Sequence, residues 1–271
     1  MRVNSFPMKR MLAVAITLLL SFSVASAQDW AKQTLEKSPR HGEWVQLKHD
    51  NRTLQAFIVY PETKGKAPVV VVIHEIFGLS DWARSVADQL AAHGYIAIAP
   101  DLLSGFGPKG GGTSDFASTQ DTMKAISGLD PDVVTADLNA AADYGKKLPA
   151  ANGKLAVAGF CWGGSQSFRF ATNRKDLNAA FVFYGTGPKD VANITAPVYG
   201  FYAGNDARVD ATIPDTTTAM KSAGKQYDPV TYDGAGHGFM RAGEDPANTN
   251  PANKTAHDQG WERWLNLLKS L

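Results

Sequence analysis

Apolar runs alternate along the chain with segments of helical periodicity. Pro68–Ile73 is a nearly continuous β-branched run, typical of a strand buried on both faces of a sheet. Asp81–His93 instead spaces its apolar residues along one helical face, and Gly94 ends the segment. The same patterns predict further strands at 54–60, 95–99, 155–159, 179–184, 198–203 and 227–232, and helices at 132–147, 209–222 and 257–268.

Strand–helix alternation of this kind predicts an α/β fold with a mostly parallel central sheet and helices on both faces. No internal repeat, low-complexity segment or linker divides the sequence. Residues 28–271 are therefore expected to form one domain, which is within the usual size range for a large α/β domain.

The first 27 residues have a different character. Basic residues at Arg2, Lys9 and Arg10 precede an apolar stretch at 11–24, and Ala25-Ser26-Ala27 follows. This order predicts a secretory signal peptide cleaved after Ala27, and hence a periplasmic or secreted protein. The apolar stretch is shorter than the ~20 residues of a membrane span, so no stable membrane insertion is expected after cleavage. An uncleaved anchor or a buried first helix are the alternatives.

Charge excludes some classes of partner. The chain has 27 basic and 26 acidic residues, and three of the basic residues lie within the first 27 positions. The expected mature chain carries 24 basic against 26 acidic residues, without a basic block. Neither nucleic acid nor an anionic membrane surface is therefore indicated as a partner.

Cys161 is the only cysteine, so it has no partner for an intramolecular disulfide. It lies in Gly159-Phe-Cys-Trp-Gly-Gly164, directly after a predicted strand and before a helical stretch. A nucleophile flanked by glycines between a strand and a helix is the elbow of α/β-hydrolases. The helix N-terminus favours a thiolate and a developing oxyanion. The alternative interpretation is a tight turn with a buried, inert thiol.

A nucleophile of this kind needs a base and an orienting acid, in the chain order nucleophile, acid, histidine. Asp206 follows the predicted strand at 198–203, and His237 follows the strand at 227–232. Asp210 is a weaker acid candidate because helix capping would explain it. The other histidines of the expected mature chain outside the 74–78 segment are expected to be surface residues: His41, His49, His93 and His257.

The segment His74-Glu-Ile-Phe-Gly78 comes directly after the strand at 68–73. Loops at this point supply an oxyanion-binding N–H in α/β-hydrolases, so the N–H groups of Ile76 and Trp162 are predicted to form the oxyanion hole. Glu75 would then lie beside the thiol. Metal-binding spacing such as H-E-x-x-H is missing, and neither a metal nor a cofactor is expected.

Glycines are concentrated at 105–112, within a loop at 103–115. They form no phosphate-binding motif of the P-loop or dinucleotide-binding type. Two interpretations stay open, a flexible rim over the site and a plain surface loop.

The sequence resembles the dienelactone hydrolase family. The matching motifs are H-E-I-F-G at 74–78, A-P-D-L at 99–102, G-F-C-W-G-G at 159–164, G-N-D at 204–206 and G-H-G-F-M-R at 236–241. The resemblance implies that Cys161 is the nucleophile, with Asp206 and His237 completing the triad. It further implies that Glu75 holds the thiol in a resting state until substrate displaces it, which would limit thiol oxidation.

Two arginines bind the substrate carboxylate in that family, a geometry that suits a carboxylate. The second matches Arg241, whereas the first falls on Gly105, and the next arginine along the chain is Arg169. Lys109 is a candidate substitute, although it is a point charge. The expected export signal also departs from a cytoplasmic dienelactone-degrading enzyme.

These observations predict a monomeric hydrolase that cleaves a small carboxylic ester or lactone through an acyl-enzyme. One alternative is acyl transfer or cleavage of another acyl bond, such as a thioester or peptide. Another is a non-catalytic periplasmic binding protein built on a hydrolase scaffold, because fold alone does not define function.

Overall fold

The computed structural model describes residues 29–271 and contains one eight-stranded sheet with the order β1-β2-β4-β3-β5-β6-β7-β8. The signal-peptide prediction lies outside the described residues. The β1–β2 and β2–β4 pairs are antiparallel, and all the other neighbouring strands are parallel. The strands are β1 (Gly42–His49), β2 (Arg52–Val59), β3 (Ala67–Ile73), β4 (Ile96–Asp101), β5 (Ala151–Phe160), β6 (Ala179–Phe183), β7 (Val198–Ala203) and β8 (Tyr227–Tyr232).

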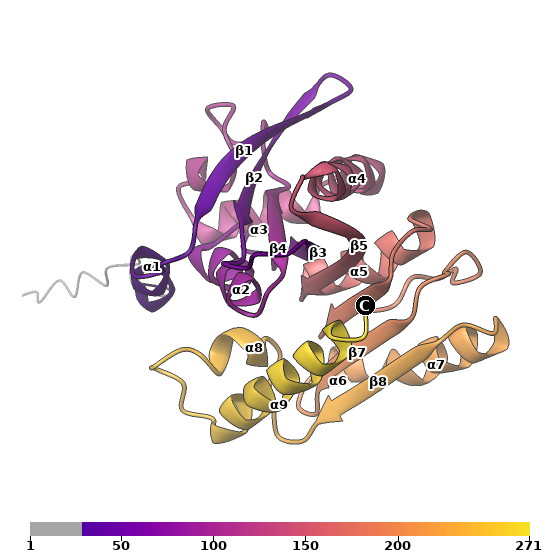
Figure 1. Ribbon diagram of the computed structural model, residues 1–271. Helices are drawn as coiled ribbons and strands as arrows, with labels where there is room; N and C mark the ends of the chain where they lie inside the picture. Colours follow the sequence, from indigo (N-terminus) through magenta and orange to yellow (C-terminus); the bar gives the residue numbers. More distant parts are fainter. Residues whose placement is uncertain (1–28) are drawn as a thin grey trace, which may run out of the picture.

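Helices cover both faces of the sheet, as the alternating pattern predicts (Figure 1). Side chains of α2 and α9 enter the core on one face, and those of α4, α5 and α7 enter the core on the other. The helices are α1 (Asp29–Glu36), α2 (Asp81–Ala92), α3 (Thr119–Ser127), α4 (Pro131–Lys147), α5 (Trp162–Asn173), α6 (Ala207–Asp210), α7 (Ile213–Ser222), α8 (Phe239–Ala242) and α9 (Pro251–Leu268), with a short 3-10 turn at Thr113–Asp115.

The β-branched run of β3 explains why the sheet can be buried on both sides. Val70 and Val72 belong to the core on one face, whereas Val69, Val71 and Ile73 belong to the core on the other. All five are fully buried. The two-sided burial confirms the prediction of a central parallel strand.

Several elements differ from the prediction. The segment predicted as one helix at 209–222 is two helices, because the chain turns at Ala211 and Thr212 before α7 begins at Ile213, with Pro214 in its first turn. α9 begins at Pro251, earlier than predicted, with the side chain of Asn250 as its cap. The elements that were not predicted are α1, β1, α3 and α8, which are short or largely exposed and therefore lack a long apolar pattern.

The parallel strands bring their carboxyl ends to one edge of the sheet. Ile73 of β3 is in register with Gly159 of β5, and Ala203 of β7 is in register with Tyr232 of β8. The loops that follow these four strands carry the residues singled out from the sequence. This is the edge at which ligands bind in open α/β sheets.

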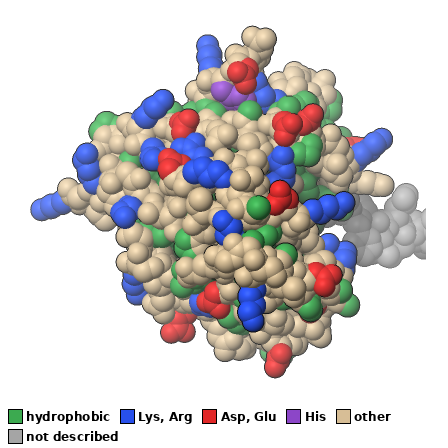
Figure 2. Space-filling view, turned by 90° about the vertical axis from the view of Figure 1, so that its right-hand side faces the viewer, with side chains coloured by type: hydrophobic (Ala, Val, Ile, Leu, Met, Phe, Trp, Pro, Cys, Tyr) green, Lys and Arg blue, Asp and Glu red, His purple; other side chains and the backbone are tan. Residues whose placement is uncertain are grey.

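The outer surface carries both signs of charge. Acidic and basic side chains are interspersed on the face shown in Figure 2. Within residues 29–271, no helix has the length and apolar character needed to cross a membrane.

Candidate active site

The turn between β5 and α5 places Cys161 in a strained backbone conformation, with φ 58° and ψ −117°. The chain can turn so sharply because glycines stand where backbone segments nearly touch. A Cβ atom on Gly159 would lie 1.9 Å from the carbonyl oxygen of Gly163, and one on Gly163 would lie 2.3 Å from that of His74. The elbow predicted from the sequence is therefore present, and Cys161 protrudes from it at the N-terminus of α5.

The three residues singled out as nucleophile, base and acid are in contact. The Sγ atom of Cys161 lies 3.1 Å from Nε2 of His237. The other ring nitrogen, Nδ1, is hydrogen-bonded to the carboxylate of Asp206. Because a carboxylate only accepts, Nδ1 carries a proton and Nε2 faces the sulfur. This relay is the geometry of an activated nucleophile.

The charge environment favours a protonated imidazole at the centre of this relay. The hydrogen bond with Cys161, opposed by burial and reinforced by the hydrogen bond with Asp206, raises the pKa of His237 to about 9. The raised pKa makes the ring a stronger acceptor for a proton, and the imidazolium that forms lies in a position to balance negative charge on sulfur.

His237 is also held by packing that was not predicted. The edge of its ring meets the ring of Tyr184, with centroids 5.1 Å apart and an interplanar angle of 64°. Tyr184 directly follows β6, is fully buried and has a positive φ of 40°. In the sequence it is the last residue of the apolar run predicted as the strand at 179–184, so the pattern indicates only an ordinary core residue.

Glu75 and Arg241 form a buried ion pair next to the triad. Nε of Arg241 donates to Oε2 of Glu75 over 2.7 Å, and the guanidinium lies 5.2 Å from the centroid of Phe77. Burial raises the pKa of Glu75, and the neighbouring guanidinium opposes that shift. In this structure the glutamate faces Arg241 and the thiol faces His237, so the resting contact between Glu75 and the thiol stays a prediction.

Two backbone N–H groups are available beside the sulfur-bearing turn. Trp162 is the first residue of α5, so its N–H has no partner within the helix. The N–H of Ile76 makes no hydrogen bond with any other residue of the 29–271 region. The ring of His74 stacks on that of Trp162 with centroids 5.8 Å apart, which ties the two turns together.

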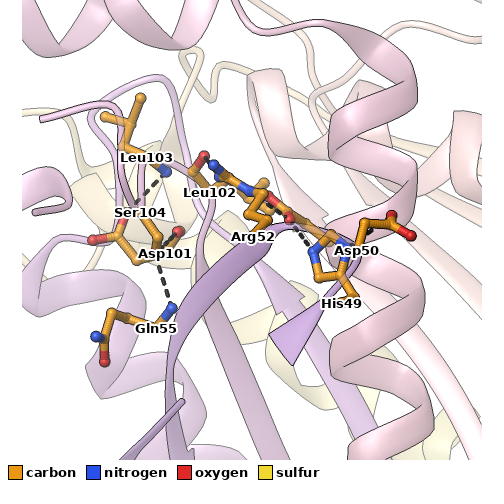
Figure 3. Close-up of polar contacts among 9 residues, drawn as sticks. His49, Asp50, Arg52, Gln55, Asp101, Leu102, Leu103 and Ser104 are labelled. Atoms are coloured by element: carbon orange, nitrogen blue, oxygen red, sulfur yellow. Dashed lines mark hydrogen bonds and ion pairs between the residues drawn. The ribbon is translucent and has the colours of Figure 1, made fainter. Parts of the chain in front are cut away.

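A polar cluster that the sequence did not indicate lies at the end of β4. Arg52 donates through Nε to both oxygens of the buried Asp137, at 2.8 and 3.0 Å, and Nε2 of His49 lies 2.6 Å from the same carboxylate. Figure 3 shows His49 and Arg52 of this cluster beside the loop that contains Ser104. The hairpin between β1 and β2, this loop and α4 enclose a cavity of about 670 Å³.

This cluster bears on the arginine that the family pattern would place at Gly105. A Cβ atom on Gly105 would lie 3.8 Å from Nη1 of Arg52, so a guanidinium does lie close to that position. Lys109 lines a neighbouring cavity together with Phe106, whose ring packs against the guanidinium of Arg52 at 4.4 Å. Arg169 bonds instead to Asp132 and the carbonyl of Pro131 on α4.

Three expectations for the competing residues need correction. His49 and His257 are not free surface residues, because their side chains are 17% and 12% exposed and bind Asp137 and Glu244. Asp210 does not cap a helix. The residue at the start of α6 is Asp206, whose side chain accepts from the N–H of Val209 at 3.4 Å. His41 and His93 are exposed, as expected.

Within residues 29–271, no cluster of three or more His, Cys, Asp or Glu side chains has an arrangement that could hold a metal ion.

A mostly parallel eight-stranded sheet with a strained turn after β5 defines the chain as an α/β-hydrolase. The sequence model of the dienelactone hydrolase family matches residues 54–271. The chain therefore belongs to the dienelactone hydrolase family, and it is a hydrolase of that type.

Individual relatives agree with this assignment. A candidate carboxymethylenebutenolidase of Escherichia coli (strain K12) is 31% identical over 223 residues, covering 77% of this chain and 79% of the relative. The carboxymethylenebutenolidase of Pseudomonas putida is 30% identical over 201 residues, covering 71% and 83%. The solved structure of a dienelactone hydrolase-like promiscuous phosphotriesterase from metagenomic libraries has a TM-score of 0.71 at 25% identity, covering 86% of this chain and 98% of that one.

Proposed function

We propose that the protein is an exported carboxylic ester or lactone hydrolase that uses Cys161 as a nucleophile. The observation that carries the proposal is the contact of the Cys161 sulfur with Nε2 of His237, 3.1 Å away, while Nδ1 of the same ring is bound to Asp206. This contact gives the thiol an acceptor for its proton and gives the base a fixed tautomer.

In the first half-reaction, the thiol proton passes to Nε2 of His237 and the sulfur attacks the acyl carbon. The carbonyl oxygen becomes an oxyanion that accepts hydrogen bonds from the N–H groups of Ile76 and Trp162. The bond from carbon to the leaving oxygen then breaks, and His237 returns its proton to that oxygen. The products are an alcohol and a thioester of Cys161; with a lactone, the alcohol remains attached to the acyl chain.

In the second half-reaction, His237 removes a proton from water, and the water oxygen attacks the thioester carbon. Collapse of the second oxyanion breaks the carbon–sulfur bond, and the proton on His237 returns to the sulfur. The acid product leaves, and no cofactor is consumed. Asp206 stays ionised throughout and stabilises the imidazolium that forms in each step.

Arg241 is the proposed contact for a carboxylate on the substrate. The Nε atom of its guanidinium is bound to Glu75, which leaves the other two nitrogens as further donors, and the side chain is 26% exposed. A carboxylate that approaches Arg241 would compete with Glu75 for the guanidinium.

The proposal is tested with the purified protein on a dienelactone, a neutral aryl acetate and a phosphotriester. The phosphotriester is included because a structural relative bears that activity in its name. Wild-type protein should hydrolyse the lactone or the aryl ester, and the Cys161→Ala variant should lose this activity while keeping its circular dichroism spectrum. Unchanged activity in Cys161→Ala would remove the nucleophile assignment. A folded wild-type protein that binds lactones or esters without hydrolysing them would support the binding-protein alternative.

A further inference from the structure

A threonine in the glycine-rich loop ties the end of β4 to the turn that follows β3. The N–H of Thr113 donates to Oδ2 of Asp101 over 2.8 Å, and its hydroxyl donates to Oδ1 over 2.7 Å. The same hydroxyl accepts the N–H of Leu79 at 3.0 Å. Asp101 is 5% exposed and also accepts the N–H of Leu103, as Figure 3 shows. Thr113 is thus fixed to Asp101 by two hydrogen bonds, and its hydroxyl in turn fixes the N–H of Leu79; these hydrogen bonds are called the clamp below.

The backbone at Gly78 and Gly112 lies very close to the Thr113–Asp101 pair. Gly78, with φ +74°, leaves room for the threonine, because a Cβ atom there would lie 2.4 Å from the Thr113 hydroxyl. A Cβ atom on Gly112 would lie 2.1 Å from Oδ2 of Asp101. Since a Cβ atom at either glycine would collide with the pair, the end of the turn has little freedom to shift.

The beginning of the same turn is fixed by His74. Its Nδ1 donates to the carbonyl oxygen of Glu75 over 2.7 Å, and the N–H of Gly78 donates to that oxygen over 3.2 Å. Because His74 is fully buried, burial lowers its pKa. The neutral ring therefore keeps a single proton, and the carbonyl contact assigns that proton to Nδ1.

The carbonyl of Glu75 and the N–H of Ile76 belong to one peptide unit. A trans peptide is planar, so the N–H points opposite to the carbonyl. Two donors on the carbonyl therefore fix the direction of the Ile76 N–H, and they also strengthen it as a donor by polarising the peptide. Leu79, three residues further on, fixes the other end of the turn through Thr113.

We propose that Thr113, anchored on Asp101, and His74 are positioning residues that aim the Ile76 N–H at the oxyanion formed on Cys161. This inference rests on the proposed function and adds three residues to it. None of the three touches the reacting atoms. Their effect is to hold an oxyanion donor in place before the reaction, which avoids reorganisation at the transition state.

The kinetic effect of displacing the Ile76 N–H depends on the stage of the reaction at which this N–H acts. An oxyanion forms only during the reaction, so a misdirected Ile76 N–H should lower kcat and kcat/KM together. Displacement of a catalytic group by about 1 Å costs up to ~10²-fold, so a loss of about ten- to a hundredfold is expected when the clamp is broken. The reactivity of the thiol itself should not change, because His237 and Asp206 are untouched.

The experiment compares Thr113→Val, which removes the hydroxyl at nearly constant shape, with Thr113→Ser, which keeps it. Ser114→Ala is the matched control, because Ser114 is exposed and its hydroxyl makes no hydrogen bond within residues 29–271. Hydrolysis of an aryl acetate is measured alongside the rate of thiol alkylation by iodoacetamide across pH. Thr113→Val should lose activity with an unchanged alkylation profile, whereas Thr113→Ser and Ser114→Ala should stay near wild type.

Full activity in Thr113→Val would overturn the inference. An altered alkylation profile in Thr113→Val would overturn it too, because the substitution would then have changed the reactivity of the Cys161 thiol itself. If Thr113→Val does not fold, Asp101→Asn serves in its place, since it removes one of two accepting oxygens and should give a smaller loss. Activity that survives in Cys161→Ala refutes the proposed function, whereas activity lost in Cys161→Ala but intact in Thr113→Val refutes the positioning role alone.

Discussion

Glu75 and Arg241 are 166 positions apart in the sequence, and their side chains meet in an ion pair of 2.7 Å at the base of the site. The glutamate is 3% exposed, and the arginine is 26% exposed. A buried charge is costly unless a partner compensates it. The pair therefore joins the turn after β3 to α8, and the proposed substrate contact of Arg241 is made by a side chain that also compensates a buried charge.

Removal of Arg241 should destabilise the protein by about 3–5 kcal/mol at neutral pH, because it leaves Glu75 buried and unpaired. Chemical denaturation of Arg241→Met measures this loss, and Glu75→Gln/Arg241→Met should recover much of it. Burial already raises the pKa of Glu75, so protonation relieves the unpaired charge, and the loss in Arg241→Met should shrink as the pH falls. The control is Lys254→Met, which breaks the exposed pair with Asp258 and should cost at most about 1 kcal/mol. Equal losses of stability in Arg241→Met and Lys254→Met would contradict the role of burial.

The elevated pKa of His237 predicts a defined pH window for stability. The folded pKa is about 9 against an ordinary value of 6.5. A raised pKa in the folded state gives stability that is complete below pH 6.5 and is lost as the pH rises through about 9. The unfolding midpoint of wild type relative to His237→Gln should therefore fall across that window.

Proton NMR of the imidazole provides the direct measurement. The His237 resonance should titrate near pH 9 in wild type and at lower pH in Cys161→Ala, since the hydrogen bond with Cys161 is the largest cause of the shift. An unchanged midpoint in Cys161→Ala would show that the sulfur does not contribute.

Much of the site could be predicted because it depends on local sequence. The turn around Cys161 is encoded by glycines within a few positions, and the places of Asp206 and His237 follow from the strands before them. The parallel sheet then brings the loops to one edge without any further information.

What could not be predicted depends on contacts between distant segments. Thr113 reaches Leu79 across 34 positions, and Arg52 reaches the neighbourhood of Gly105 from an antiparallel strand. Neither residue lies in a motif that local periodicity or spacing would reveal. β1 escaped prediction for a different reason, because an edge strand with Trp44 half exposed has no buried run.

Substrate charge provides a prediction about Arg241 that is separate from stability. Arg241→Lys keeps the positive charge but loses the planar fork that binds a carboxylate through two hydrogen bonds. It should lower kcat/KM for a lactone bearing a carboxylate by roughly ten- to a hundredfold, since a charge-assisted hydrogen bond contributes about 1.5–3 kcal/mol. The neutral aryl acetate should be affected far less. Equal losses on both substrates would mean that Arg241 acts only through Glu75 and the shape of the turn.

The last prediction concerns Gly163, which lies very close to the backbone of the turn after β3. A Cβ atom there would lie 2.3 Å from the carbonyl oxygen of His74 and 2.5 Å from that of Ile73, and both are backbone atoms that cannot rotate away. Gly163→Ala should therefore push α5 away from the turn after β3 and separate the N–H groups of Trp162 and Ile76. We expect a stability loss of about 1–3 kcal/mol from overpacking, and a fall in kcat of up to ~10²-fold from the displaced donors.

The matched control is Gly65→Ala, where a Cβ atom would meet nothing within 4 Å. That variant should stay within about 0.5 kcal/mol of wild type and retain full activity. Thermal unfolding and aryl acetate hydrolysis on the two variants separate the outcomes, and a fully active Gly163→Ala would mean that the two turns need not be in contact for catalysis.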